Sequence, residues 1–125
     1  MFQKIIWLAL AGACGTLARY ALSGAVHRWL GSSFPWGTAV VNITGCLLFG
    51  IVWAAAGERG TISPELRTII LVGFMGAFTT FSTFISETGQ LLSEAELLIG
   101  LTNIAFQIAI GLGLFYLGVG IGRTI

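Results

Sequence analysis

The sequence has little charge and no aspartate. Only 9% of its 125 residues are charged, against about a quarter in soluble domains, and all five acidic residues are glutamates. With a formal net charge of +1, the chain lacks the basic surface that nucleic acids require. Hydrophobic residues make up 56% of the chain. This balance excludes an ordinary soluble domain and predicts no nucleic-acid partner.

Groups for metal binding and acid–base catalysis are also scarce. Cys14 and Cys46 each lie in an apolar segment with no second cysteine or histidine nearby, which is typical of small buried side chains. His27 is the only histidine and stands beside Arg28, as expected for a polar residue at a helix end. Neither a Ser-His-Asp set nor a phosphate-binding loop is present in the sequence. We therefore expect that the protein is not an enzyme.

Long uncharged windows occupy most of the chain. They cover residues 29–57, 68–86 and 97–122, and another apolar stretch precedes them if Arg19 lies at an interface or faces a partner. A membrane-spanning helix needs about 20 mostly apolar residues. We predict an all-α, multi-pass membrane protein with a single domain. Its four transmembrane helices are expected at about residues 2–27, 36–56, 64–92 and 94–122.

Capping signals mark where two of these helices begin. Ser63-Pro64-Glu65 combines an N-cap serine, a proline in the first helical position and an acid in the first turn. Ser93 and Glu96 resemble a capping box for the last helix. Because the connections are short, we expect consecutive helices to be antiparallel neighbours.

The basic residues give only a weak preference for one orientation in the membrane. With four crossings, both chain ends and the second connection lie on one side. The expected division is Lys4, Arg59, Arg67 and Arg123 on that side, and Arg19 and Arg28 on the other. So small a bias permits insertion in both orientations. A chain this small also cannot easily enclose a pore alone, so we predict an antiparallel, dual-topology homodimer.

The third predicted helix carries an unusual polar and aromatic run. Two glycines are followed by hydroxyl residues threaded between phenylalanines, in the order Gly73, Gly76, Phe78, Thr79, Thr80, Phe81, Ser82, Thr83 and Phe84. An unpaired backbone group in hydrocarbon costs several kcal/mol, so a helix is not loosened there without a reason. We predict that the glycines open this helix near its middle. Such a segment at membrane depth indicates an ion or substrate site.

Helical spacing would sort these side chains onto two neighbouring faces. Those faces are Phe78, Phe81 and Phe84 on one, and Thr80, Thr83 and Glu87 on the other. Aromatic ring edges are electropositive and hydroxyls donate hydrogen bonds, which suits a small anion that must shed its water. Alternatively, the rings pack against lipid or other helices and the hydroxyls bond to carbonyls four residues earlier.

Amide side chains also occur inside the uncharged windows. Asn42 follows Thr38 by four residues in the second helix, and Gln107 follows Asn103 by four in the last. An amide there should face protein or water and not lipid. Asn42 could donate to an anion or bond a neighbouring helix, and spacing alone leaves both open. Glu87 is expected near the end of the third helix, close to the membrane interface.

Three motifs collect most of these residues. They are Gly12-x-x-Gly15-x-x-x-Arg19-Tyr20, then Gly37-Thr38-x-x-x-Asn42-x-x-Gly45-Cys46, then Gly73-Phe74-x-Gly76-x-x-Thr79-Thr80-Phe81-Ser82-Thr83-Phe84. Together with the four-helix plan, they resemble the Fluc (CrcB) family of fluoride channels over essentially the whole chain. The Thr-Thr-Phe-Ser-Thr-Phe run is the specific part, whereas glycine-rich membrane helices alone would be weak support.

The resemblance implies a fluoride-selective channel in the cytoplasmic (inner) membrane, built as an antiparallel dual-topology homodimer with paired pores. It implies that fluoride passes Asn42, Phe81, Ser82, Thr83 and Phe84. It also implies a structural sodium ion at the dimer interface. The backbone carbonyls of Gly76 and Thr79 would hold this ion.

The resemblance further implies roles at the pore mouth and along a polar track. Glu87 matches an acidic residue near a pore mouth, and Arg19 matches a basic residue of the first helix. Thr38, Asn103 and Gln107 would extend the track. The chain departs from the family where Gly76-Ala77-Phe78 replaces a common Gly-Gly-Leu, and where Gln107 stands in place of a serine.

A small four-helix multidrug antiporter is the main alternative function. Such a transporter depends on a membrane-buried carboxylate, but the first predicted helix has no acid and Glu87 is expected near an interface. A structural membrane subunit is a further alternative. It would need no donor pattern beside a helix break.

Overall fold

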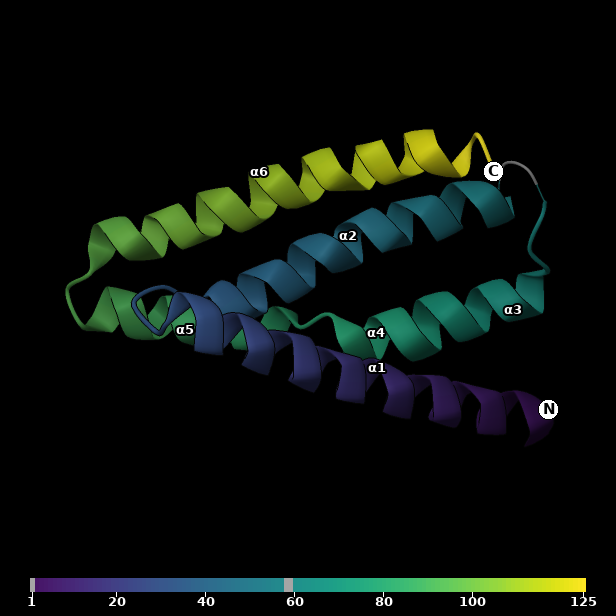
Figure 1. Cartoon of the computed structure of the whole chain (residues 1–125), viewed down its shortest axis with the longest axis horizontal. Helices are drawn as coiled ribbons and strands as arrows, with labels where there is room; N and C mark the ends of the chain where they lie inside the picture. The colour runs from purple at the N-terminus through teal and green to yellow at the C-terminus, as the bar shows by residue number, and fades with distance from the viewer. Residues whose placement is uncertain (1, 58–59) are drawn as a thin grey trace.

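A computed structural model describes residues 2–57 and 60–125, and the regular secondary structure of these residues is helical. Among the described residues, four helices are long and apolar enough to cross a membrane. They are α1 (Phe2–Leu30), α2 (Trp36–Gly57), the composite helix Pro64–Ser93 and α6 (Leu97–Gly122) (Figure 1). The prediction of an all-α, multi-pass membrane protein is confirmed. Arg59, which entered the charge comparison, lies outside the described residues.

The third span is assembled from four segments. These are α3 (Pro64–Thr68), the π-helix η1 (Ile69–Met75), the single turn α4 (Gly76–Phe78) and α5 (Phe81–Ser93). Between α4 and α5, Thr79 and Thr80 have extended backbones, with φ/ψ of −80°/160° and −149°/110°. The span is therefore interrupted near its middle, as predicted, and it bends there (Figure 1).

The glycines do not open the helix themselves, so that part of the prediction is wrong. Gly73 lies inside η1 and Gly76 is the first residue of α4, and both are helical. The interruption follows at Thr79 and Thr80, where side chains of other segments take up the backbone groups, as described below.

Capping was predicted correctly for the third span and wrongly for the last. The Ser63 hydroxyl accepts a hydrogen bond from the Leu66 N–H at 3.3 Å, and Pro64 takes the first helical position. Ser93, by contrast, is the last residue of α5 and donates its hydroxyl to the Gly89 carbonyl at 2.8 Å. The last helix consequently begins at Leu97, not near residue 94, and its N-cap residue forms no side-chain capping bond.

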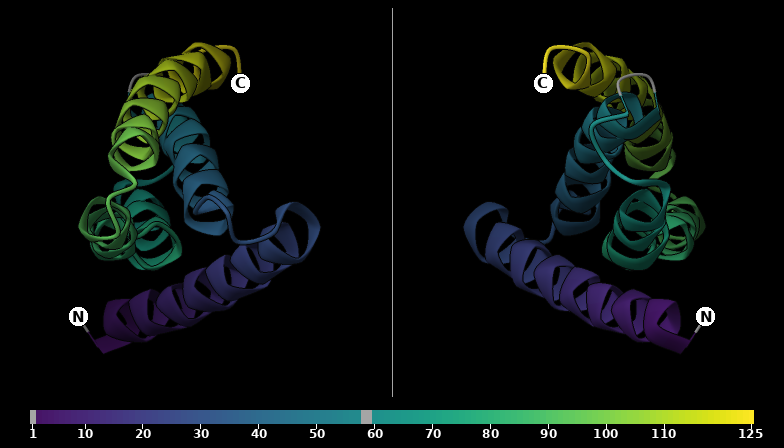
Figure 2. Two further views of the ribbon diagram at one scale, coloured as in Figure 1. Left: turned by 90° about the vertical axis from the view of Figure 1, so that its left-hand side faces the viewer. Right: turned by 90° about the vertical axis from the view of Figure 1, so that its right-hand side faces the viewer.

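The closest helix pair is not consecutive in sequence. Helices α2 and α6 run side by side in the same direction (Figures 1 and 2). A Cβ atom added at Gly50 would collide with the Phe115 carbonyl oxygen, and one added at Gly118 would collide with the Leu47 carbonyl oxygen. Backbones can approach this closely only at glycine, which is how helices associate in lipid. The expectation of packing between consecutive helices therefore misses the tightest contact.

Helix α1 packs along η1, α2 and α4 and is open on its outer side (Figure 2). A Cβ atom at Gly15 would collide with the Phe74 carbonyl oxygen, and one at Gly73 would lie 2.9 Å from the Ala11 Cβ. A small core of Val41, Leu71, Met75 and Phe78 fills the space between α2 and the first half of the third span. Thus α1 and α2 together hold the segments that precede the interruption.

The chain ends lie at one end of the bundle. The N-terminus, the C-terminus and the α2–α3 connection share that end, and the α1–α2 and α5–α6 connections share the other (Figure 1). This arrangement is the one expected from four crossings. Lys4 near the start of α1, Arg67 in α3 and Arg123 just after α6 therefore belong to the first end, and Arg28 near the end of α1 belongs to the second.

We predict that Gly118→Ala lowers the free energy of unfolding by about 1–3 kcal/mol, because the added methyl group collides with the Leu47 carbonyl and forces α2 and α6 apart. Thermal denaturation in detergent, followed by circular dichroism, would measure the change. Gly113→Ala is the matched control, since no atom lies within 4 Å of a Cβ at Gly113 in the same helix. Equal stability of the two variants would contradict the close α2–α6 contact.

Candidate functional site

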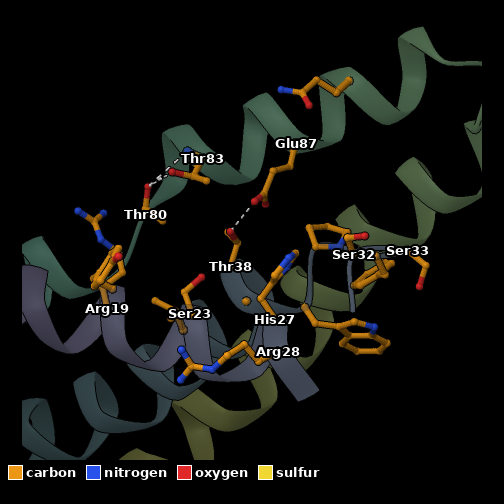
Figure 3. Close-up of a pocket in the computed structure, with 18 of the residues that line it drawn as sticks. Arg19, Ser23, His27, Arg28, Ser32, Ser33, Thr38, Thr80, Thr83 and Glu87 are labelled. Carbon is orange, nitrogen blue, oxygen red and sulfur yellow. Dashed lines mark hydrogen bonds between the residues drawn. The ribbon is translucent and has the colours of Figure 1, made fainter. Parts of the chain in front are cut away.

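An open cavity of about 800 Å³, lined by both polar and apolar side chains, lies between α1, α2, α5 and the connection that follows α1. Four residues singled out from the sequence line it, namely Arg19, Thr38, Thr83 and Glu87 (Figure 3). Thr80, His27 and Arg28 line it as well. Glu94 lines it too, so hydroxyls, cations and two carboxylates meet in one water-accessible space.

Glu87 and Thr38 join α5 to α2 across this cavity. The Thr38 hydroxyl donates to Glu87 Oε1 at 2.8 Å, and the Thr38 side chain is buried (Figure 3). Glu87 Oε2 is buried too and has no hydrogen-bond partner among the residues that the structure describes. An acceptor left unbonded in this way is costly. Glu87 is thus held at the cavity wall with one oxygen unused.

The predicted face of Thr80, Thr83 and Glu87 is confirmed. All three line the cavity, and the Thr80 and Thr83 hydroxyl oxygens lie 2.9 Å apart. Ser82 is exposed beside them, with its hydroxyl oxygen 3.4 Å from that of Thr80. The first turn of α5 therefore presents a cluster of hydroxyl groups.

The predicted common face of the three phenylalanines is wrong. Phe78 is buried in the core cluster, whereas Phe81 is 74% exposed. The extended residues between α4 and α5 change the direction of the chain, so helical spacing does not apply across them. Phe81 and Phe84 remain together, with ring centroids 5.8 Å apart and an interplanar angle of 49°. Phe84 is buried, so the pair runs from the surface into the protein.

Asn42 of α2 binds the peptide groups of Thr80 at the interruption. The Thr80 N–H donates to Asn42 Oδ1 at 2.8 Å, and Asn42 Nδ2 donates to the Thr80 carbonyl at 3.1 Å. A side-chain amide matches a peptide group in both directions, so both backbone groups of Thr80 are satisfied without a helix. This pair of bonds explains how the chain can be extended at membrane depth.

Two carbonyl groups lose their helical donors as a result. In a continuous α-helix, the N–H of residue 80 would donate to the carbonyl of Gly76, and that of residue 83 to the carbonyl of Thr79. Here the Thr80 N–H donates to Asn42, and the Thr83 N–H donates to the Thr80 hydroxyl at 3.3 Å. Gly76 is also exposed at the surface. These are the two carbonyls that the family resemblance associates with a cation.

Thr79 is fixed from two sides. Its hydroxyl donates to the Met75 carbonyl at 3.0 Å, and its methyl group lies where a Cβ at Gly45 would be. Gly45 of the second motif is therefore needed to make room for Thr79. The hydroxyl of Thr79 bonds back along its own helix, as the alternative interpretation of these residues expected.

The amides of α2 and α6 form one hydrogen-bonded group. Asn42 Nδ2 donates to Gln107 Oε1 at 2.8 Å, and Gln107 Nε2 donates to Asn103 Oδ1 at 2.9 Å. Asn103 is fully buried, and its Nδ2 donates a hydrogen bond to the Thr88 hydroxyl at 2.9 Å. The bond from Asn42 to a neighbouring helix, one of the two roles considered for this residue, is present.

Thr88 was not singled out from the sequence, and Thr80 was predicted on the polar face but not as the residue at which the helix restarts. Thr80 is the N-cap of α5, and its place before Phe81-Ser82-Thr83 is a usual N-cap signal once the helix is known to restart there. Thr88 is buried and bonds to both Asn103 and the Phe84 carbonyl. Nothing in the spacing of Thr88 distinguishes it from other threonines in membrane helices.

Comparison with known proteins identifies the family of the chain. The family model described as "CrcB-like protein, Camphor Resistance (CrcB)" matches residues 6–119. The chain belongs to the CrcB family. Its interruption, cavity and amide group are therefore features of a CrcB protein.

Curated relatives of this CrcB protein match along its full length. A protein of Solidesulfovibrio magneticus named "Fluoride-specific ion channel FluC" is 55% identical over 125 residues, which is 100% of both chains. Proteins with the same name from Nitrosococcus oceani and Desulforapulum autotrophicum are 54% and 50% identical, again over 100% of both chains.

Proposed function

We propose that this protein is a fluoride-specific ion channel that lets fluoride leave the cell passively across the cytoplasmic membrane. The observation that carries the proposal is its similarity of 55% and 54% identity, over the full length, to two proteins named as fluoride-specific ion channels. Four candidate spans and an open cavity that reaches Thr80 at the interrupted helix support it. The names of these relatives also favour transport over enzymatic chemistry.

In this proposal, fluoride passes the first turn of α5. Phe81 and Phe84 offer ring edges, and the hydroxyls of Ser82 and Thr83 can donate hydrogen bonds. Weak donors can replace part of the water around fluoride and still release the ion, as conduction requires. Asn42 forms part of the wall beside them, although both of its Nδ2 hydrogens already bond to Thr80 and Gln107.

The cavity serves as the mouth of this path. Arg19 lies on one wall with His27 and Arg28 nearby, and Glu87 and Thr38 lie at its inner side (Figure 3). Glu94 lines the cavity as well, so its two arginines are balanced by two glutamates and the lining carries no excess of positive charge. The buried amides Asn103 and Gln107 lie behind Asn42 as the α6 part of the polar track.

A structural sodium ion is proposed at the carbonyls of Gly76 and Thr79. Their helical donors are diverted to Asn42 and to the Thr80 hydroxyl, so both oxygens can serve as hard ligands for a small cation. The donor set fits sodium better than an anion, since a carbonyl oxygen can only accept hydrogen bonds or coordinate a cation. Gly76 is exposed, so a second chain can reach it.

The proposed assembly is an antiparallel, dual-topology homodimer. The weak bias of basic residues between the two ends of the bundle supports insertion in both orientations. A second copy in the opposite orientation would place a second pair of carbonyls against the first. Sodium shared between the copies would then stabilise the dimer.

One observation favours the alternative of a coupled transporter. Glu87 lies within the third span, partly buried and facing the cavity, where a carboxylate could exchange a proton for a cation. The alternative predicts that transport stops when the proton gradient is removed. Passive fluoride flux does not need such a gradient, so one assay separates the two functions.

We predict that the purified protein in liposomes releases internal fluoride rapidly and releases chloride at a rate near that of empty liposomes. The reason is that hydroxyl donors come closer to the small fluoride ion than to the larger chloride ion and therefore bind fluoride more strongly. Fluoride-selective and chloride-selective electrodes would record the two effluxes without a proton gradient. Folded protein that releases no fluoride would contradict the proposal.

Phe81→Ile and Phe84→Ile should each lower fluoride efflux about tenfold, because losing an aromatic contact worth about 1.4 kcal/mol at the rate-limiting step changes the rate by that factor. Phe115→Ile is the control, since Phe115 packs against Phe49 at a centroid distance of 6.4 Å and contacts α2. If the Phe81 and Phe84 variants both release fluoride at the wild-type rate, these residues do not lie on the fluoride path.

Exchanging sodium for a large organic cation during long incubation should abolish fluoride efflux and shift the dimer toward monomer. The freed carbonyls of Gly76 and Thr79 cannot coordinate a cation too large to enter between them. Efflux and size-exclusion chromatography would be measured before the exchange, after it and after sodium is returned. Full activity after prolonged exchange would argue against the ion site.

A further inference from the structure

A continuous chain of hydrogen bonds links the interruption to a point two turns along α5. It begins at Thr80, runs through one residue of α2 and two of α6, and ends in α5. We name it the amide relay, and its members are Asn42, Gln107, Asn103 and Thr88. The final bond runs from the Thr88 hydroxyl to the Phe84 carbonyl at 2.7 Å.

Backbone groups at both ends fix the direction of every bond in the relay. The Thr80 N–H can only donate, so Asn42 must present its oxygen to it and its Nδ2 to Gln107. Gln107 then accepts with Oε1 and donates with Nε2 to Asn103. The same orientation continues from Asn103 to the last member.

The far end agrees with this direction. Asn103 donates a hydrogen bond to the Thr88 hydroxyl, and this hydroxyl donates its own hydrogen bond to the Phe84 carbonyl. A carbonyl can only accept. No amide in the relay can be turned over without placing two acceptors or two donors against each other. Hydrogen bonds aligned in one direction also strengthen one another in a low-dielectric interior.

Burial makes the relay costly to disturb. Asn103 is 0% exposed, Thr88 4% and Gln107 8%, so water cannot replace a missing partner. Removing one member leaves its neighbours with unsatisfied polar groups inside the protein. Such a loss also affects Asn42, because its Nδ2 group donates one hydrogen bond to Gln107 and one to the Thr80 carbonyl.

We propose that Gln107, Asn103 and Thr88 are positioning residues that act through Asn42 to hold the Thr80 peptide at the interruption. While Asn42 holds the Thr80 N–H, that group cannot return to the Gly76 carbonyl. The α6 amides therefore act on the path indirectly, by keeping the helix open, and need not touch the ion. The effect on ion flow, but not the effect on the Thr80 peptide, rests on the proposed function.

Hydrogen exchange of the Thr80 amide tests the relay without any transport assay. In the full-length protein in detergent, Thr88→Val and Gln107→Met should each speed exchange at Thr80 about tenfold or more, because each removes a link that holds Asn42. Amides in the middle of α2 should keep their wild-type rates, which separates this effect from general unfolding. NMR spectroscopy would report the rates residue by residue.

Two further variants separate the hydroxyl group of Thr88 from its packing. Thr88→Ser keeps the hydroxyl and should leave exchange at Thr80 near the wild-type rate. Thr68→Val is the matched control, since the Thr68 hydroxyl also bonds to a carbonyl four residues back, that of Pro64, but lies outside the relay. Equal acceleration in Thr88→Ser and Thr88→Val, or none in folded Thr88→Val and Gln107→Met, would overturn the proposal.

If the apolar variants fail to fold, the wild-type protein still decides the question. The side-chain amide protons of Asn103 and Gln107 should exchange as slowly as buried backbone amides, since the relay holds them. Exchange at the rate of free amides would rule the relay out.

Fluoride efflux adds a test of the relay as a single unit. Thr88→Val and Gln107→Met should each lower efflux, and the double variant should be no slower than the slower single one, within about twofold, because both break the same chain. Effects that multiply would overturn the relay as a unit. Absence of efflux from the wild-type protein would instead overturn the proposed function, and the exchange result would stand.

Discussion

The bidentate pairing between Asn42 and the Thr80 peptide is the interaction on which the site depends. An extended residue at membrane depth has two polar groups that lipid cannot satisfy. Asn42 satisfies both, at 2.8 and 3.1 Å, and so allows α4 to end and α5 to begin inside the span. The displaced carbonyls, the hydroxyl cluster and the position of Phe81 all follow from this exchange of partners.

Close backbone contacts place Asn42 and the third span where the pairing can form. Gly15 lets α1 approach the carbonyl of Phe74, and Gly45 makes room on α2 for Thr79. In lipid, where apolar side chains gain little by leaving their surroundings, such contacts replace the hydrophobic effect in holding helices together. Gly15 thus sets the distance between α1 and η1, and Gly45 leaves the space on α2 that the Thr79 methyl group fills.

Sequence reasoning identified the four spans, the interrupted third helix and the family, because uncharged length and a dense polar run are visible in the chain itself. It placed the interruption at Gly73 and Gly76, although the chain opens at Thr79 and Thr80. The difference has a physical cause, since Asn42 competes for the Thr80 N–H from another helix. Spacing within one helix cannot reveal such a competitor. The burial of Phe78 and the role of Thr88 depend in the same way on partners distant in sequence.

The π-helix before the interruption has a consequence for the register of the whole span. Its hydrogen bonds reach five residues back, so it fits one more residue into a turn than an α-helix does. Each added residue rotates everything that follows by about 100° around the axis. The π-helix at residues 69–75 thus helps to determine which later residues face the protein: Met75 and Phe78 are buried, and Gly76 is exposed. A family member that lost one residue here would turn all the later segments of the span toward different neighbours.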